Sequence, residues 1–318
     1  MIIGGFFIFA PAQNQQIVFE QPTPPEKIIT LPPQIKTEED LGIDLSPPPD
    51  EKLELPPPKE IIKILPPPLP AETLVKAEPP RKLVPQPELY AKGLLATVNF
   101  LCPNANGTYG VATGAIIDPH GYIISNAHIV DQKNQQPTCT IRRGSPAVDI
   151  GKAKLILLPA EYFATTDQQL QARMDISLWK LEGNRVDWPH WNIDFDTTPR
   201  VGEQLLTQSY PAELLSNELV FKNLNLLFSN TIITETDASI IASRATIAAQ
   251  HGSSGGMLID PYTGMLRGII FGISSDTEKS INTRILYAIA PTRINSIIWQ
   301  ETKKQFREYL AALPEPTY

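Results

Sequence analysis

Residues 252–256 read Gly-Ser-Ser-Gly-Gly, and apolar runs typical of strands lie on either side, at 239–247 and 256–259. Glycine lets the backbone make a tight turn and keeps side chains away from neighbouring N–H groups. A serine hydroxyl beside free N–H groups is what an alkoxide nucleophile and its developing oxyanion require. Because most clusters of glycine and serine are plain turns, this stretch alone leaves its chemistry open.

Short apolar runs separated by Gly, Asn, Asp and Pro extend to both sides of this turn. Many short strands with turn residues between them favour barrels or sandwiches over alternating β–α units. The predicted strands are residues 94–100, 110–117, 122–125, 138–142, 153–158, 176–181, 203–209, 224–233, 239–247, 256–259, 266–273 and 286–290. Six precede a polar segment at 188–200 and six follow it, so we predict an all-β fold of two packed barrels, at about 90–195 and 200–290. Apolar residues at helical spacing after Pro291 predict a terminal helix at about 291–313.

A histidine and an aspartate stand at the ends of two such runs. His128 follows the run at 121–125, and Asp175 opens the run at 176–181. A lone histidine at such a place is more often structural, and an aspartate at a strand edge is a common cap. Together they fit a base and the carboxylate that fixes its tautomer. The chain order His128, Asp175, Ser254 is that of the chymotrypsin arrangement.

These stretches resemble the trypsin-like serine proteases of the HtrA (Do-like) group. The resemblance is carried by 114–130 (GAIIDPHGYIISNAHIV), 175–180 (DISLWK), 252–256 (GSSGG) and 286–291 (LYAIAP), and it covers about residues 90 to 308. It implies a chymotrypsin/trypsin-like double six-stranded β-barrel with the active site between the barrels. It also implies hydrolysis of peptide bonds in protein or peptide substrates through an acyl-enzyme, with no cofactor and no metal.

The same resemblance implies a role for each site residue. His128 is the general base, Asp175 its orienting carboxylate and Ser254 the nucleophile, whereas Ser253 has no role in the reaction. The N–H groups of Gly252 and Ser254 form the oxyanion hole. Met257 replaces the proline that usually follows the double glycine in that group. We expect a protease domain without a PDZ domain, so peptide sensing through such a domain is not carried over.

The resemblance also implies where the specificity pocket lies relative to the nucleophile. Ala248, six residues before Ser254, takes the place of the pocket floor, and Ile273, Ser274 and Ser275 would form a wall. Since the floor position carries no acid, a preference for Lys or Arg is disfavoured. We expect a small or medium-sized apolar residue before the scissile bond.

The N-terminal region has a different composition. Of the 32 prolines, 20 fall within the first 90 residues, and proline blocks the propagation of both helix and sheet. We predict a disordered Pro-rich linker at 13–89, extended as polyproline II; a partner that binds Pro-rich motifs is the alternative use. Residues 1–12 are uncharged and mostly apolar, and they are interpreted as a signal peptide or hydrophobic segment.

The composition limits which partners, metal sites and cellular locations the protein can have. The net charge is −7, and no basic stripe is present, which argues against nucleic acid as a partner. Two cysteines, Cys102 and Cys139, are too few for a structural zinc site; they form either a disulfide or two buried thiols. We expect an exported protein (periplasmic, extracellular or membrane-anchored), with a cytoplasmic location left open. The competing function is an inactive scaffold of the same fold that works through its Pro-rich arm.

Overall fold

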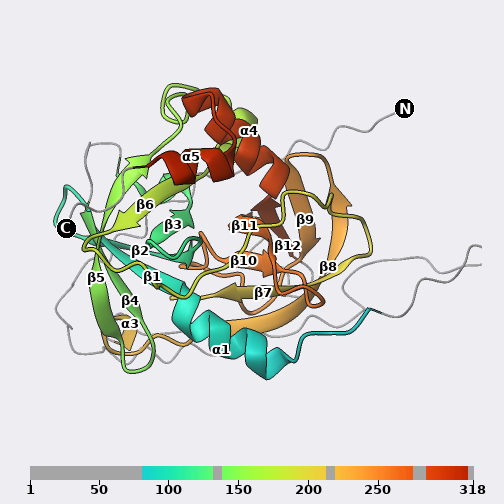
Figure 1. The fold of residues 1–318 in the computed structure, drawn as a ribbon, viewed down its shortest axis with the longest axis horizontal. Helices are drawn as coiled ribbons and strands as arrows, with labels where there is room; N and C mark the ends of the chain where they lie inside the picture. Colours follow the sequence, from blue (N-terminus) through green and yellow to red (C-terminus); the bar gives the residue numbers. More distant parts are fainter. Residues whose placement is uncertain (1–80, 132–137, 213–218, 275–283, 314–318) are drawn as a thin grey trace, which may run out of the picture. The chain divides into compact units, whose positions relative to one another are not determined.

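The structure is a computed structural model that describes residues 81–131, 138–212, 219–274 and 284–313 (Figure 1). The predicted N-terminal segment 1–12 and residues 13–80 of the predicted linker lie outside the described residues. Residues 81–85 have no regular structure.

The described strands close into two six-stranded barrels whose pairs are all antiparallel. The first has the order β1-β2-β3-β6-β5-β4 and the second β10-β11-β12-β9-β8-β7. The predicted double barrel is therefore confirmed, with each predicted strand overlapping one observed strand. The strands are β1 (Thr97–Pro103), β2 (Tyr109–Ile116), β3 (Tyr122–Ser125), β4 (Thr138–Arg143), β5 (Val148–Leu157), β6 (Ser177–Leu181), β7 (Gln204–Ser209), β8 (Leu227–Thr236), β9 (Ile240–Arg244), β10 (Met257–Ile259), β11 (Leu266–Ile273) and β12 (Ile285–Ile289).

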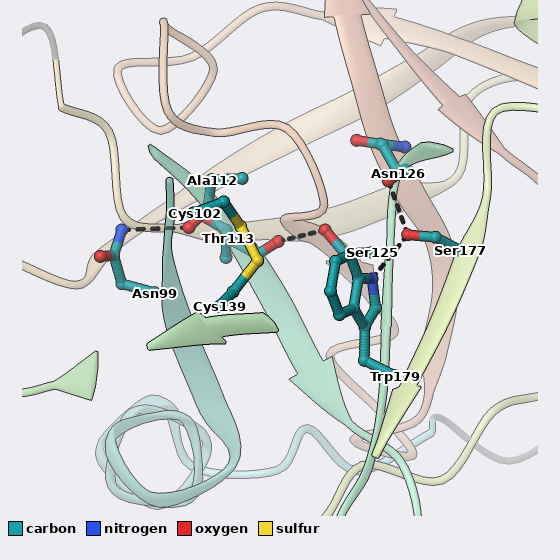
Figure 2. The surroundings of a disulfide bond; sticks show 9 residues. All are labelled: Asn99, Cys102, Ala112, Thr113, Ser125, Asn126, Cys139, Ser177 and Trp179. Atoms are coloured by element: carbon teal, nitrogen blue, oxygen red, sulfur yellow. Dashed lines mark hydrogen bonds between the residues drawn. A yellow bond between two sulfur atoms is a disulfide. The ribbon is translucent and has the colours of Figure 1, made fainter. Parts of the chain in front are cut away.

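Each barrel is filled by apolar side chains from its own strands. Phe100, Ile141 and Trp179 have no exposed surface in the first barrel, and Leu258 and Leu286 have none in the second. Cys102 of β1 and Cys139 of β4 form a disulfide, which decides between the two alternatives left open by the sequence (Figure 2).

The helices correct two predictions. Helix α1 (Gln86–Ala96) occupies the end of the predicted linker and the start of the first predicted strand. Proline is tolerated in the first turn of a helix, where its missing N–H would have no partner, so Pro87 begins a helix here rather than preventing one.

The terminal helix is two helices, α4 (Pro291–Thr302) and α5 (Phe306–Ala312). Lys303 adopts left-handed φ of 59° and ends α4, and a capping box between Gln305 and Glu308 starts α5. Short helices not predicted from the sequence are α2 (Gln168–Arg173), α3 (Leu219–Lys222) and the 3₁₀ turn η2 (Ala127–Ile129). No helix in the described ranges is long and apolar enough to cross a membrane.

A buried ion pair fixes the segment between the barrels to the second barrel. Arg267 of β11 is 1% exposed, and its Nη1 lies 2.6 Å from Oδ2 of Asp194. Burial acts to raise the pKa of Asp194, but hydrogen bonds from residues 196 and 197 and from Arg267, with the charge of Arg267, bring that pKa below its usual value. Glu203 at the start of the second barrel contacts the same guanidinium group at 3.2 Å.

Candidate active site

His128 and Asp175 are joined by two hydrogen bonds. The ring Nδ1 of His128 lies 2.6 Å from Oδ2 of Asp175, and the backbone N–H of His128 donates to Oδ1 at 2.8 Å. The two side chains are 17% and 5% exposed. Since Asp175 takes up Nδ1, the ring is oriented with Nε2 available for a second partner.

Asn126 fixes the chain just before His128. Its side-chain N–H donates to the backbone carbonyl of Asp175 at 2.8 Å. The backbone carbonyl of Asn126 accepts a hydrogen bond from Ser177 Oγ at 2.6 Å. Ser177 Oγ in turn accepts from the indole N–H of Trp179 (Figure 2). The segment that carries His128 is therefore bound to β6 and to the residue that orients its ring.

The charge of Asp175 determines how His128 titrates. Burial acts to lower the pKa of His128, but the negative charge of Asp175 and its hydrogen bond act to raise it, and the net result is a pKa above the usual 6.5. The pair therefore stabilises the imidazolium form, which a general base needs once it has accepted a proton.

Tyr162 is a third member of this group that the sequence did not indicate. Its ring is 6% exposed and packs with Ala127 and Met174, the neighbours of His128 and Asp175 in the chain. Burial raises the pKa of Tyr162 far above its usual range, and the negative charge of Asp175 raises it further. Tyr162 lies 13 residues before Asp175 in a loop without a motif, so no sequence signal pointed to it.

Ser253 and Ser254 differ in their surroundings. Ser253 is 2% exposed, and its Oγ accepts from the N–H of Gln250 at 2.9 Å and lies 3.2 Å from Oγ of Ser209. Ser254 is less buried, and no hydrogen bond joins its hydroxyl to His128 in the described part of the chain. Contact between His128 and Ser254 therefore stays a prediction; in proteases without substrate this contact is often loose.

The carbonyl groups around Ser254 are all bonded. The carbonyl of residue 251 accepts from Ala212 N–H at 2.8 Å, and that of Gly252 from the Thr113 hydroxyl at 2.9 Å. The carbonyls of Ser253 and Ser254 accept from the N–H groups of Gly256 and Thr113, each at 2.7 Å. No described residue accepts a hydrogen bond from the N–H of Gly252 or Ser254, so both predicted oxyanion donors have no acceptor within this part of the protein.

The three glycines of this stretch are required by space. A side chain at Gly252, where φ is +90°, would lie 2.6 Å from the N–H of Ala212. One at Gly256 would lie 2.7 Å from the carbonyl of Ser253, and one at Gly255 would collide with the Thr113 carbonyl. The last clash shows how closely this turn of the second barrel approaches β2 of the first.

The predicted pocket residues lie in different surroundings. Ala248 has no exposed surface, and its carbonyl accepts from the hydroxyl of Ser209. Ile273 ends β11 and is half-buried, and Ser274 next to it is bonded to the first residue of β12. Ser275 lies outside the described residues. Their part in specificity stays a prediction.

A cavity away from the triad and the distribution of possible metal ligands also bear on the chemistry of the protein. A cavity of about 520 Å³ lies between α5, the 117–122 turn and the 190–195 segment, and none of the residues of the predicted triad lines it. Within the described ranges, no group of three or more His, Cys, Asp or Glu side chains could hold a metal ion.

The family model described as "Trypsin-like peptidase domain" matches residues 112–269. These residues are therefore similar to a trypsin-like peptidase domain. The matched region spans β2 to β11 and includes the predicted triad, and the match supports a serine-type endopeptidase. Among solved structures, the crystal structure of the serine endoprotease from Yersinia pestis is similar, with a TM-score of 0.46 and 20% identity over 69% of this chain and 67% of that chain. No curated protein matches the chain.

Proposed function

We propose that this peptidase domain is catalytically active and uses His128, Asp175 and Ser254 as its triad. His128 is the general base, Asp175 orients it, and Ser254 is the nucleophile. The N–H groups of Gly252 and Ser254 bind the oxyanion.

The observation that carries the proposal is the backbone arrangement around Ser254. A peptide group turned the other way would place a carbonyl in the oxyanion hole, where it would repel a developing negative charge. Here the carbonyls of residues 251 and 253 are bonded to the N–H groups of Ala212 and Gly256. The N–H groups on the far sides of the same peptides, those of Gly252 and Ser254, are the proposed donors.

The reaction follows from these positions. Ser254 Oγ attacks the carbonyl carbon of the scissile peptide while His128 Nε2 takes its proton. The carbonyl oxygen becomes an oxyanion held by Gly252 and Ser254. The C–N bond then breaks as His128 returns the proton to the leaving amine, which leaves an acyl-enzyme. Water, deprotonated by His128, attacks the ester, and its hydrolysis restores Ser254.

Labelling with a fluorophosphonate separates this proposal from the inactive scaffold. An active site should attach the probe covalently to Ser254, and labelling should disappear in Ser254→Ala and in His128→Ala. Ser253→Ala is the matched control, since it removes the neighbouring hydroxyl and should still be labelled. A wild-type chain that folds but is neither labelled nor able to degrade an unfolded protein would favour the scaffold.

We also propose that the enzyme prefers a small or medium-sized apolar residue before the scissile bond. Ala248 at the predicted pocket floor brings neither a negative charge nor bulk. A peptide library cleaved best after Val or Ala would support this, and cleavage mainly after Arg or Lys would contradict it.

The resemblance to the HtrA group leads us to propose a role outside the cytoplasm, in protein quality control of the cell envelope. The Cys102–Cys139 disulfide supports export, because such bonds persist in oxidising compartments. Fractionation of the source cells with thiol alkylation before lysis is the test. Finding the chain in the cytoplasm with both thiols alkylated would contradict the proposal.

A further inference from the structure

Thr113 of β2 uses each of its polar groups to hold neighbouring parts of the site. It has no exposed surface. Its N–H donates to the carbonyl of Ser254 at 2.7 Å, and its carbonyl accepts from Ser125 Oγ at 2.7 Å (Figure 2). Its hydroxyl contacts the N–H of Tyr210 and the carbonyl of Gly252, each at 2.9 Å.

The direction of the hydroxyl bonds is fixed by chemistry. The N–H of Tyr210 can only donate, so it takes up a lone pair of Thr113 Oγ1. The single hydroxyl hydrogen is left for the carbonyl of Gly252, which can only accept. A methyl group in place of this hydroxyl would leave the buried N–H of Tyr210 and the partly buried carbonyl of Gly252 without partners.

The carbonyl that Thr113 holds belongs to the peptide between the two proposed oxyanion donors. The N–H of that peptide, on Ser253, donates to the carbonyl of Gln250 at 2.9 Å, so the Thr113 hydroxyl fixes its other end. Gly252 has positive φ and no side chain, which makes rotation about its backbone bonds easy. Oxyanion donors must stay within a few tenths of an ångström of their productive positions.

We propose that Thr113 is a positioning residue that holds the oxyanion hole in its active arrangement from the opposite barrel. Its backbone carbonyl is bonded to Ser125, three residues before His128, so the same residue also connects the nucleophile turn to the segment that carries the base. The inference rests on the proposed peptidase activity of Ser254 and concerns the same site.

The test compares Thr113→Val, which keeps the shape and removes the hydroxyl, with Thr113→Ser, which restores it. Thr113→Val should lower kcat about 10- to 100-fold with KM little changed, less than the 10²–10³-fold loss caused by removing an oxyanion donor itself. Thr113→Ser should recover kcat to within about threefold of wild type. A peptide boronic acid, which forms an oxyanion-like adduct, should bind more weakly to Thr113→Val by a similar factor.

Thr97→Val is the matched control. Thr97 is fully buried in the same barrel, and its hydroxyl also contacts one donor and one acceptor, Trp191 and Gln208, but it does not touch the nucleophile turn. The Thr97→Val variant should lose about as much stability as Thr113→Val and should keep the kcat of the wild type. If Thr113→Val does not fold, Thr113→Ala, which leaves room for water, replaces it.

The outcomes separate this inference from the proposed function. If Thr113→Val turns over substrate as fast as the wild type, or if Thr97→Val loses as much kcat as Thr113→Val, the role of Thr113 is overturned and the proposed function still stands. A folded wild-type chain that neither turns over substrate nor reacts with fluorophosphonate would overturn the proposed function and this role with it.

Discussion

The imidazole of His128 and its own backbone N–H bind the two different oxygens of the Asp175 carboxylate, although the residues are 47 positions apart. Both oxygens are occupied, so neither the ring nor the carboxylate can rotate without breaking a hydrogen bond. Asp175 is therefore in a position to fix the tautomer and the direction of His128 together, and the first three predictions concern this pair and its neighbour.

Asp175→Asn should keep the shape of the side chain and lower kcat on the order of 10⁴-fold, the loss known for this change in the chymotrypsin-type triad. The amide N–H₂ cannot accept from Nδ1–H, so the ring favours the wrong tautomer. Steady-state kinetics on a peptide substrate, with circular dichroism to show folding, is the measurement. A loss below about tenfold in a folded variant would exclude Asp175 from the triad.

The acid limb of kcat/KM against pH should have its midpoint above 6.5. His128 must be neutral to accept a proton, and its pKa in the folded protein is raised above 6.5 by Asp175 despite burial. Activity should therefore rise as pH increases through this raised pKa. The residual activity of Asp175→Asn should show a limb at lower pH, because the charge that raises the pKa is gone. If the midpoint of the acid limb of the wild type lay clearly below pH 6.5, the assignment of His128 as the general base would be contradicted.

Tyr162→Phe should lower kcat modestly, by about threefold to tenfold, because the phenol hydroxyl is a polar neighbour of the Asp175 carboxylate and losing such a neighbour costs about 0.5–1.5 kcal/mol. Loss of the hydroxyl should also shift the acid limb, because it removes a polar neighbour of the Asp175 carboxylate, whose charge raises the pKa of His128. Tyr309→Phe in α5 is the control for removal of a phenol hydroxyl elsewhere and should leave the pH profile unchanged. An unchanged profile in Tyr162→Phe would reduce the role of Tyr162 to packing.

Much of the fold could be predicted because the strands are short, apolar and bounded by turn residues. The apolar runs that predict strands at 94–100 and 266–273 supply buried side chains to the barrels, and such local patterns survive folding. The break at Lys303 was missed because apolar spacing in 294–310 continues past it, and one left-handed residue has no strong signal. Helix α1 was missed because Pro87 was interpreted as a breaker, although its place in the first turn makes it compatible with a helix.

The candidate site was predictable where chemistry needs a fixed residue type, as at His128, Asp175 and Ser254. Tyr162 and Thr113 were not, since their roles depend on where a loop and a neighbouring barrel come to lie. Nothing in the sequence around Thr113 indicates that its hydroxyl would reach Gly252, 139 residues away. Such contacts between distant segments follow from the packing of two barrels rather than from any local pattern.

Asp194→Asn should lower the free energy of unfolding at neutral pH by about 3–5 kcal/mol, because it leaves Arg267 buried without its closest charge. The folded-state pKa of Asp194 is depressed below 3.8, so its stabilising contribution is present above that value and is lost as pH falls through the folded pKa. The difference between variant and wild type should therefore shrink in acid. Denaturant unfolding at pH 7 and near pH 3 measures it. Asp187→Asn, in an exposed pair with Arg185, should cost no more than about 1 kcal/mol, and an equal loss there would contradict the argument from burial.

Ser254→Ala and His128→Ala should each lower kcat by several orders of magnitude, and the double variant should be little worse than either. The nucleophile and its base act as one unit, so once either is absent the other has nothing left to contribute. All three variants should fold, because each change removes a partly exposed group rather than core volume; the His128 side chain is 17% exposed and Ser254 is not fully buried. Melting temperatures and kcat/KM measured together, on protein purified free of host proteases, make the comparison. Additive losses in the double variant would mean that Ser254 and His128 act independently, and near-normal turnover by Ser254→Ala would end the serine-peptidase mechanism for this chain.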